Sequence, residues 1–198
     1  MARPRRHDPD RRERIVDAAL AVVGRAGIGG LSHRTVAAEA DVPLGSTTYH
    51  FASLDELLVA ALRRVDGTFG ARLRRDPEID APDLAAGLAA LLRERLGAEP
   101  TGVALEYELY LAALRRPALR PVAAEWTDEA VAALAPRTGP VTARALVALM
   151  DGISLQVLLT GAAYDEGYAR EMLARILNED PNRQAGASSE PPTDQTDT

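Results

Sequence analysis

The stretch VPLGSTTYHF, residues 42–51, decides the fold of this chain. Pro43 suits the first turn of a helix and disfavours helical geometry in the residue before it, so residues 41–43 end one helix and start another. A glycine, three consecutive hydroxyl residues, a tyrosine and a histidine follow. This segment is too polar for a protein core and too patterned for a plain loop. It predicts a short helix from about Leu44 to His50.

The sequence on both sides of this segment predicts three more helices. Apolar residues at helical spacing indicate a helix over residues 10–26, and Ser32 is placed to cap a short helix through about Ala40. A capping-box pattern at residues 53–56 starts a long helix over residues 53–75. Two short helices joined by a tight turn and braced on either side form a helix-turn-helix, whose second helix lies in the DNA major groove.

The predicted reading helix and its surroundings carry groups suited to DNA. A slim polar helix front reads base edges, flanking donors bind phosphate, and a basic arm follows the backbone or enters a minor groove. Taken singly, these hydroxyls, the tyrosine and the histidines are also ordinary surface or structural groups, but their convergence favours DNA binding. The candidate DNA-binding residues are Arg3, Arg5, Arg6, His33, Arg34, Leu44, Gly45, Ser46, Thr48, Tyr49 and His50.

Charge is divided unevenly between the two ends of the chain. The net charge is -6, yet residues 1–75 hold 13 arginines against 9 acidic residues, while residues 76–198 hold 10 against 20. Such asymmetry is expected where only one lobe of a protein meets an anion. It favours nucleic-acid binding by the N-terminal end, with chance clustering of solvated charge as the alternative.

Beyond a break rich in Pro and Asp at residues 74–83, the pattern predicts more helices and no sheet. These helices lie near residues 84–96, 102–116, 118–134, 141–161 and 165–177. We expect an all-α fold with a DNA-binding domain over residues 1–52. An effector-binding and dimerisation domain over residues 53–178 begins with a linking helix at 53–75, and a disordered tail covers 179–198.

The chain shows neither an export signal nor a convincing membrane span. Acidic residues interrupt the N-terminal apolar run. The apolar run at 145–164 is long enough to cross a bilayer, but it carries Asp151 and Gln156 mid-length, and charges there are costly in lipid. We interpret it as a buried helix. With no cysteine, the chain suits a reducing cytoplasm, and we expect a cytoplasmic protein without a membrane partner.

Residues 10–62 resemble the DNA-binding region of the TetR family of transcriptional regulators. The matching residues are Gly27, Leu31, Ser32, Ala37, Ala40, Val42, Gly45, Tyr49, His50, Phe51, Ser53, Glu56, Leu57 and Leu58. Four positions depart from the family pattern. Asp41 replaces a usual Gly in the turn, Thr47 an inward-facing Leu, Thr48 a common Tyr and Leu54 a usual Lys. These departures indicate an altered operator sequence.

The resemblance implies a homodimer that binds a double-stranded inverted-repeat operator and, as a repressor, is released by a small-molecule effector. In the family the last two helices dimerise, and we expect the interface at Leu146, Ile153, Val157, Leu158, Met172, Leu173 and Ile176. A larger monomeric bundle is the alternative. Twofold-related reading helices would lie about 34–36 Å apart.

Aromatic residues concentrate in the C-terminal half and suggest where the effector binds. Small-ligand sites combine aromatic and aliphatic walls with a few polar anchors. The candidate effector contacts are Glu106, Tyr107, Tyr110, Trp126, Met150 and Ser154. A buried, ionised Glu106 would favour a cationic effector. As alternatives, the aromatic residues are core, and Glu106 or Glu108 pairs with Arg115 or Arg116.

Two other classes of function stay open. The three histidines all lie within the first 50 residues and no glycine-rich phosphate loop occurs, so a small helical enzyme would need a carboxylate-only site. A helical carrier or adaptor whose DNA binding has decayed is the second alternative. We expect no catalytic residues, no metal and no cofactor.

Overall fold

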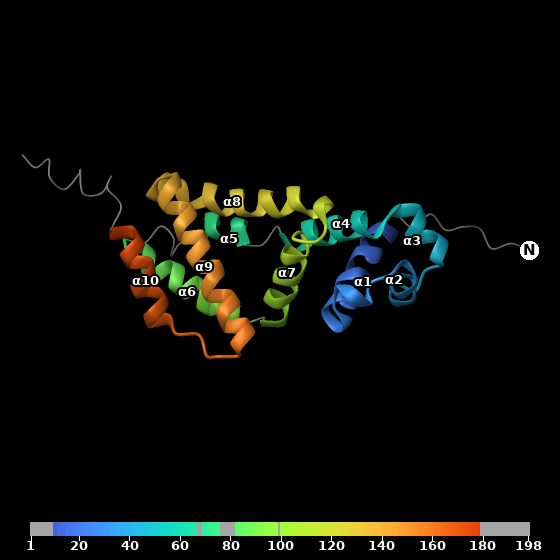
Figure 1. The fold of residues 1–198 in the computed structure, drawn as a ribbon, viewed down its shortest axis with the longest axis horizontal. Coiled ribbons are helices and arrows are strands. Elements are labelled where there is room, and N and C mark those ends of the chain that lie inside the picture. The colour runs from blue at the N-terminus through green and yellow to red at the C-terminus, as the bar shows by residue number, and fades with distance from the viewer. Residues whose placement is uncertain (1–9, 67–68, 76–81, 99, 179–198) are drawn as a thin grey trace, which may run out of the picture.

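The computed structural model describes residues 10–66, 69–75, 82–98 and 100–178. Within these ranges every regular element is a helix, which confirms the all-α expectation. The helices form an elongated molecule with the N-terminal helices at one end and the C-terminal helix at the other (Figure 1). The predicted basic arm and the predicted tail at 179–198 lie outside the described residues.

Short elements build the N-terminal end: α1 (Arg11–Ala26), the 3₁₀ turn η1 (Ile28–Gly30), α2 (His33–Glu39) and α3 (Leu44–His50). Ser32 caps α2 as predicted. Its hydroxyl accepts a hydrogen bond from the Thr35 backbone N–H at 3.0 Å, and the Thr35 hydroxyl accepts one from the Ser32 N–H at 2.9 Å. The bounds of α3 match the prediction, because Pro43 precedes it and Phe51 leaves helical geometry with φ -138°.

The turn between α2 and α3 contains one strained residue. Asp41 has a φ of 52°, and it is the one non-glycine residue with a positive φ in the described part of the chain. Left-handed geometry costs an L-residue about 1–3 kcal/mol, and a short polar side chain such as Asp bears it better than most. The departure noted at this position therefore keeps the turn geometry at some cost in stability.

Two helices follow the reading end of the molecule: α4 (Leu54–Asp66) and α5 (Phe69–Arg75). The sequence predicts one linking helix over 53–75, and residues 67–68 between the two lie outside the described residues. The predicted start is confirmed, since the Ser53 hydroxyl accepts a hydrogen bond from the Glu56 N–H at 3.1 Å. The Glu56 carboxylate accepts the Ala52 N–H at 2.7 Å, one residue earlier than in a regular capping box.

The remaining elements are α6 (Leu84–Ala98), α7 (Pro100–Ala112), the 3₁₀ turn η3 (Pro117–Leu119), α8 (Arg120–Thr138), α9 (Pro140–Thr160) and α10 (Glu166–Asn178). All the helices expected beyond residue 80 are present. The helix expected over 102–116 ends earlier, at Ala112, because a residue before proline is pushed out of helical geometry. Arg116 accordingly has φ -122° and ψ 94°.

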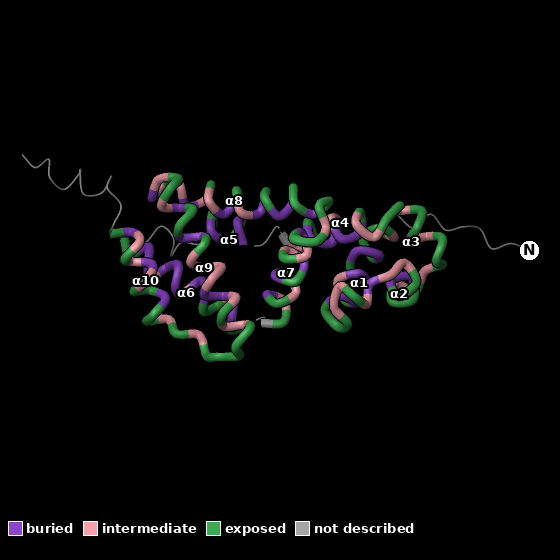
Figure 2. The backbone as a smooth tube through the Cα atoms, in the orientation of Figure 1, coloured by how far each residue is buried: buried purple, intermediate pink, exposed green. Residues whose placement is uncertain are grey.

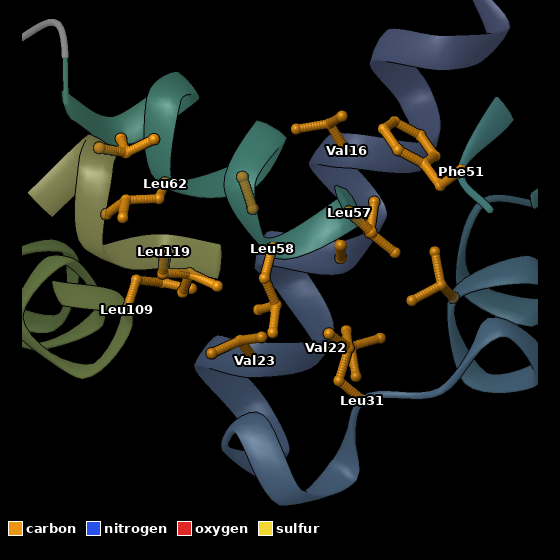
Figure 3. Packing of buried hydrophobic residues seen from close by; sticks show 14 of the residues in the cluster. Val16, Val22, Val23, Leu31, Phe51, Leu57, Leu58, Leu62, Leu109 and Leu119 are labelled. Carbon is orange, nitrogen blue, oxygen red and sulfur yellow. The ribbon is translucent and has the colours of Figure 1, made fainter. Parts of the chain in front are cut away.

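The core of the DNA-binding end is completed by helices from beyond residue 52. Figure 3 shows Leu58 and Leu62 of α4 beside Leu109 of α7 and Leu119 of η3, with Val23 of α1 next to Leu58. All five side chains are fully buried. The expected division at residue 52 is therefore not a division in packing, since the α4 and α7 leucines join the core of the N-terminal end.

A second core lies at the other end of the molecule. There α9 packs against α8, and α10 packs against α6 (Figure 1). Buried and exposed segments alternate along each helix in the way that amphipathic packing requires (Figure 2). Length and composition alone would allow α9 to cross a membrane. Its buried face belongs to this second core, but only 39% of its apolar window is buried, so within one chain the helix is less buried than the sequence interpretation expects.

Candidate DNA-binding surface and ligand cavity

The predicted reading helix α3 lies at one end of the molecule (Figure 1). Tyr49 is 84% exposed and Leu44 is 51% exposed, although both are large and largely apolar. Gly45 and Thr48 are also exposed, while Ser46 and His50 are half-buried. Large apolar side chains held open at one end of a folded domain mark a surface for a partner.

Thr47 separates the outward face of α3 from its inward face. Its side chain is fully buried, and its hydroxyl donates a hydrogen bond to the Leu44 carbonyl at 2.8 Å. The same hydroxyl lies 3.4 Å from the His33 carbonyl in α2. Thr47 therefore faces inward, as the leucine at this position of the family does, and a polar group is tolerated there because the helix backbone satisfies it.

The groups predicted to bind phosphate lie in α2 and at the C-terminal end of α3. Arg34 is exposed near the start of α2, and His33 beside it is half-buried. The rings of Tyr49 and His50 meet edge to face with their centres 5.2 Å apart, which fixes both at the C-terminal end of α3. Arg3, Arg5 and Arg6 lie outside the described residues. The predicted DNA contacts as a set stay a prediction.

A cavity lies among α5, α6, α7, α8 and α9. It is lined by Phe69, Arg95, Tyr107, Tyr110, Trp126, Thr127, Ala130, Val147 and Asp151. Three of the predicted effector contacts, Tyr107, Tyr110 and Trp126, therefore meet at one place. The cavity volume is about 20 Å³, little more than the roughly 10–15 Å³ that one water molecule requires. Any larger ligand must displace side chains that now fill it.

Asp151 is the buried carboxylate of this cavity. Its Oδ1 accepts a hydrogen bond from the Tyr107 hydroxyl at 2.9 Å. Burial raises the pKa of Asp151, and the hydrogen bond from Tyr107 and the charge of Arg95 oppose that shift. Burial and the charge of Asp151 together raise the pKa of Tyr107 to about 12. Tyr107 is therefore a neutral donor, and Asp151 is a carboxyl group whose hydration has been partly removed.

Glu106 has a different role from the one predicted. It forms an ion pair with Arg95 of α6, and the two side chains are only 14% and 9% exposed. Of the alternative partners, Arg116 pairs with Asp55, and Glu108 accepts the Ile28 backbone N–H. Since a guanidinium already neutralises Glu106, the carboxylate that faces the cavity is Asp151.

Two other predicted effector contacts, Met150 and Ser154, are buried in α9 but do not line the cavity. The prediction missed Phe69, Arg95 and Asp151. A signal for Asp151 was present, because a lone carboxylate within an apolar helix is itself a functional-site hypothesis. The sequence around Arg95 gave no such signal, because it resembles a solvated helix face. No group of three histidine or acidic residues able to hold a metal occurs in the described ranges.

Helix α7 connects the cavity to the DNA-binding end. The side chains of Tyr107 and Tyr110 line the cavity, and the Tyr110 hydroxyl lies 3.1 Å from the Thr127 hydroxyl of α8. Between them in sequence, Glu108 accepts a hydrogen bond from the Ile28 backbone N–H of η1 at 2.7 Å. A ligand that moves α7 therefore acts on a helix that also holds the turn ahead of α2.

The structure corrects part of the expected dimer interface. Leu146, Ile153 and Leu173 are 0%, 6% and 0% exposed within a single chain, because α8 and α6 already cover them. The other four, Val157, Leu158, Met172 and Ile176, are half-buried. Another face of α9 is the more open one. It carries the exposed residues Val141, Ala145, Ala148 and Leu159 and the half-buried residues Gly152 and Leu155, and Val141 and Leu159 are each 82% exposed.

This geometry matches known proteins of one kind. A family model described as Tetracyclin repressor-like, C-terminal domain, matches residues 80–179. The structure of the multidrug binding protein EbrR complexed with imidazole is similar at 65% identity and a TM-score of 0.81, covering 86% of this chain and 96% of that chain. A TetR family member from Streptomyces coelicolor A3 is similar at 65% identity and a TM-score of 0.78, covering 85% and 99%.

A curated relative is the nicotine-responsive transcriptional repressor HdnoR of Paenarthrobacter nicotinovorans. It is 29% identical over 161 residues, which cover 74% of this chain and 83% of HdnoR. The relatives are DNA-binding transcriptional regulators and not enzymes. The helix-turn-helix end, the helical C-terminal domain and these similarities show that the chain belongs to the TetR family of transcriptional regulators.

Proposed function

We propose that this regulator is a repressor that binds an inverted-repeat operator as a homodimer and leaves it when an aromatic cation enters the cavity. The observation that carries the effector half is Asp151, a buried carboxylate among the rings of Phe69, Tyr107, Tyr110 and Trp126. Aromatic faces and a buried anion are the two features that bind organic cations.

The operator half of the proposal rests on α3. Its open face carries Leu44, Gly45 and Thr48, which suit base edges and thymine methyl groups, while Tyr49 and His50 suit phosphates. A single helix of this length reads only a few base pairs. Two copies related by a twofold axis and spaced about 34–36 Å apart would read an inverted repeat along one face of DNA.

The dimer part of the proposal rests on the open face of α9. Spacings of four and three residues alternate along Val141, Ala145, Ala148, Gly152, Leu155 and Leu159, which places them in one seam. Small residues in the middle of the seam allow a close approach of a second helix. A second copy of the chain is the proposed occupant, with the half-buried residues Met172 and Ile176 of α10 beside the seam.

The chemical class of the effector follows from the cavity and is supported by relatives. EbrR, at 64–65% identity, has been crystallised with ethidium, proflavin and malachite green. All three are planar or propeller-shaped aromatic cations. Asp151 supplies the counter-charge, the tyrosine and tryptophan rings supply stacking faces, and Tyr107 keeps the carboxylate oriented.

Coupling between the sites would run through α7 and α4. A bound dye forces the rings of Tyr107 and Tyr110 apart and so displaces α7, which holds η1 through Glu108 and packs against α4. A coupling free energy of about 1–3 kcal/mol, which is usual between linked sites, would lower operator affinity several-fold to about a hundredfold.

Fluorescence titration with proflavin tests the effector site. We expect saturable binding by the wild-type protein, and a loss of affinity of at least tenfold in Asp151→Asn, since the amide keeps the shape but not the charge. The matched control is Asp128→Asn on the exposed side of α8, which should bind like the wild type. Equal affinity of Asp151→Asn and Asp128→Asn for proflavin would show that Asp151 is not part of the effector site.

Sequencing of genomic fragments captured by the purified protein tests the operator. We expect enrichment of an inverted repeat and release of those fragments on addition of proflavin. A carrier or adaptor with decayed DNA binding would enrich no repeat. Enrichment that proflavin does not reverse would retain the DNA-binding half of the proposal and reject the effector half.

A further inference from the structure

The cavity already contains a cation that belongs to the protein. The guanidinium carbon of Arg95 lies 4.5 Å from the centre of the Phe69 ring and 5.6 Å from the centre of the Tyr107 ring. The Arg95 side chain is 9% exposed, and its charge acts on the buried Asp151. Arg95 is thus a planar, delocalised cation held between aromatic faces near a carboxylate.

An aromatic cation would seek the same three partners. A guanidinium is flat, weakly hydrated and stacks on aromatic rings, so it satisfies a ring face as a cationic dye does. Two like charges in one desolvated cavity repel each other. The cavity volume of about 20 Å³ also leaves no room for a tricyclic ring system beside the arginine. Dye and guanidinium therefore exclude each other from the ring faces.

We infer that Arg95 is an internal competitor that occupies the effector site until a cationic effector displaces it, an inference that rests on the proposed function. Glu106 of α7 already pairs with Arg95 while the guanidinium is stacked, and this ion pair would keep the guanidinium neutralised after it leaves the rings. The arginine thereby selects for ligands that carry a positive charge. An aromatic cation can replace every interaction that the guanidinium loses, whereas a neutral aromatic compound leaves Asp151 without a counter-charge.

Displacement also acts on the helix that follows α4. Phe69 is the first residue of α5, and its ring is the closer of the two that Arg95 covers. Exchange of a slender guanidinium for a wide ring system at this position pushes α5 away from α6. The competitor is therefore a specificity-determining residue, and its departure is coupled to the part of the chain that leads to the DNA-binding end.

Titration of Arg95→Gln with two ligands tests the inference. Proflavin is the cation, and acridine, which has the same ring system and is uncharged under mildly alkaline conditions, is the neutral probe. We expect Arg95→Gln to bind proflavin on the order of tenfold more tightly than the wild type. Acridine affinity should change much less. Arg93→Gln, on the exposed side of the same helix, is the matched control and should behave like the wild type.

Unchanged or weaker proflavin binding by Arg95→Gln would overturn the inference. Because this variant leaves Glu106 without its guanidinium, the double variant Arg95→Gln/Glu106→Gln is titrated as well, with its helix content checked by circular dichroism. A crystal structure of the wild-type protein with proflavin gives an independent reading. There Arg95 should have left the Phe69 ring, and an arginine still stacked on it would refute displacement. If the wild type binds no cationic dye at all, the proposed effector class itself is wrong.

Discussion

At the scale of single residues, the proposed effector site centres on Asp151, a carboxyl group whose hydration the fold has partly removed. Asp151 keeps a hydrogen bond from Tyr107 and the nearby charge of Arg95, yet burial still raises its pKa. A buried anion with incomplete compensation costs stability in the free protein. The same cost favours an incoming cation, because binding restores the missing counter-charge. Stability is therefore given up where the ligand is to bind.

The raised pKa of Asp151 gives dye binding a defined pH dependence. Only the ionised carboxylate attracts a cation, so affinity is full above the folded-state pKa and falls as pH drops through it. Because that pKa lies above the ordinary 3.8, we expect the binding of ethidium, whose charge does not titrate, to weaken as the pH is lowered from about 7.5 through the folded-state pKa, and to begin weakening at a higher pH than an ordinary aspartate would cause. Fluorescence titration over this range measures the effect, and Asp151→Asn should show a flat profile. A wild-type profile as flat as that of the variant contradicts it.

At the scale of elements, α3 and α7 each have two faces with different tasks. In α3, the buried Thr47 fixes the helix to α2 while Tyr49 and Leu44 stay open. In α7, the side of Tyr107 belongs to the cavity and the side of Glu108 belongs to η1. Under the proposed function, a helix with the effector on one side and the turn ahead of α2 on the other would link the two sites mechanically.

Arg34 near the start of α2 should contribute through phosphate. If it neutralises one phosphate, Arg34→Ala lowers the slope of log affinity against log salt by about one unit, while Tyr49→Ala weakens binding to all sequences with little effect on the slope. Arg115→Ala, an exposed arginine far from α3 in sequence, serves as the control. Electrophoretic mobility shift assays at several salt concentrations measure the affinity of each variant and its salt dependence. A slope for Arg34→Ala equal to that of the wild type excludes the phosphate contact.

Glu108 should matter for the response and not for ligand affinity. Glu108→Ala removes the acceptor of the Ile28 N–H, a charge-assisted bond of about 1.5–3 kcal/mol. We expect proflavin affinity to stay within about twofold of the wild type while the dye-induced loss of operator affinity shrinks several-fold. Glu171→Ala, whose partner Arg175 lies in the same helix, is the control. Dye titration with and without operator separates the two quantities, and an unchanged response rejects α7 as the link.

At the scale of the whole molecule, the elongated shape places the reading helix and the open seam of α9 far apart (Figure 1). In the proposed dimer, the two chains would meet at the seam of α9, and the two α3 helices would lie far from that contact. A small rotation at the dimer contact would therefore change the distance between the two α3 helices. Only a spacing near one turn of DNA fits both half-sites.

Gly152 offers a test of this seam. A Cβ added at Gly152 meets nothing within 4 Å in a single chain, and a helix gains up to about 1 kcal/mol when an interior glycine is replaced. Gly152→Gln should therefore fold normally but block the close approach of a second α9 and yield monomers with weak operator binding. Gly24→Gln in α1, equally open, is the control. Light scattering after size exclusion gives the mass, and a stable Gly152→Gln dimer would place the interface elsewhere.

The sequence by itself determined the helices and the reading head. The signals that set these helices act within a few residues, so they can be found from the sequence pattern alone. They are the capping residues Ser32 and Ser53, the proline before α3 and the apolar spacing of α1. The tertiary structure alone decided which groups far apart in sequence meet through hydrogen bonds. Tyr107 and Asp151 are 44 residues apart, and Ile28 and Glu108 are 80 apart.

The structure also decided which face of α9 is buried. This helix is apolar on nearly all sides, so its periodicity does not distinguish a face toward the core of its own chain from a face toward a second chain. Leu146 and Ile153 looked as suitable for an interface as Val141 and Leu159 do. Only the packing of α8 against α9 covers the first pair and leaves the second open, because burial is a property of neighbours that the local sequence does not contain.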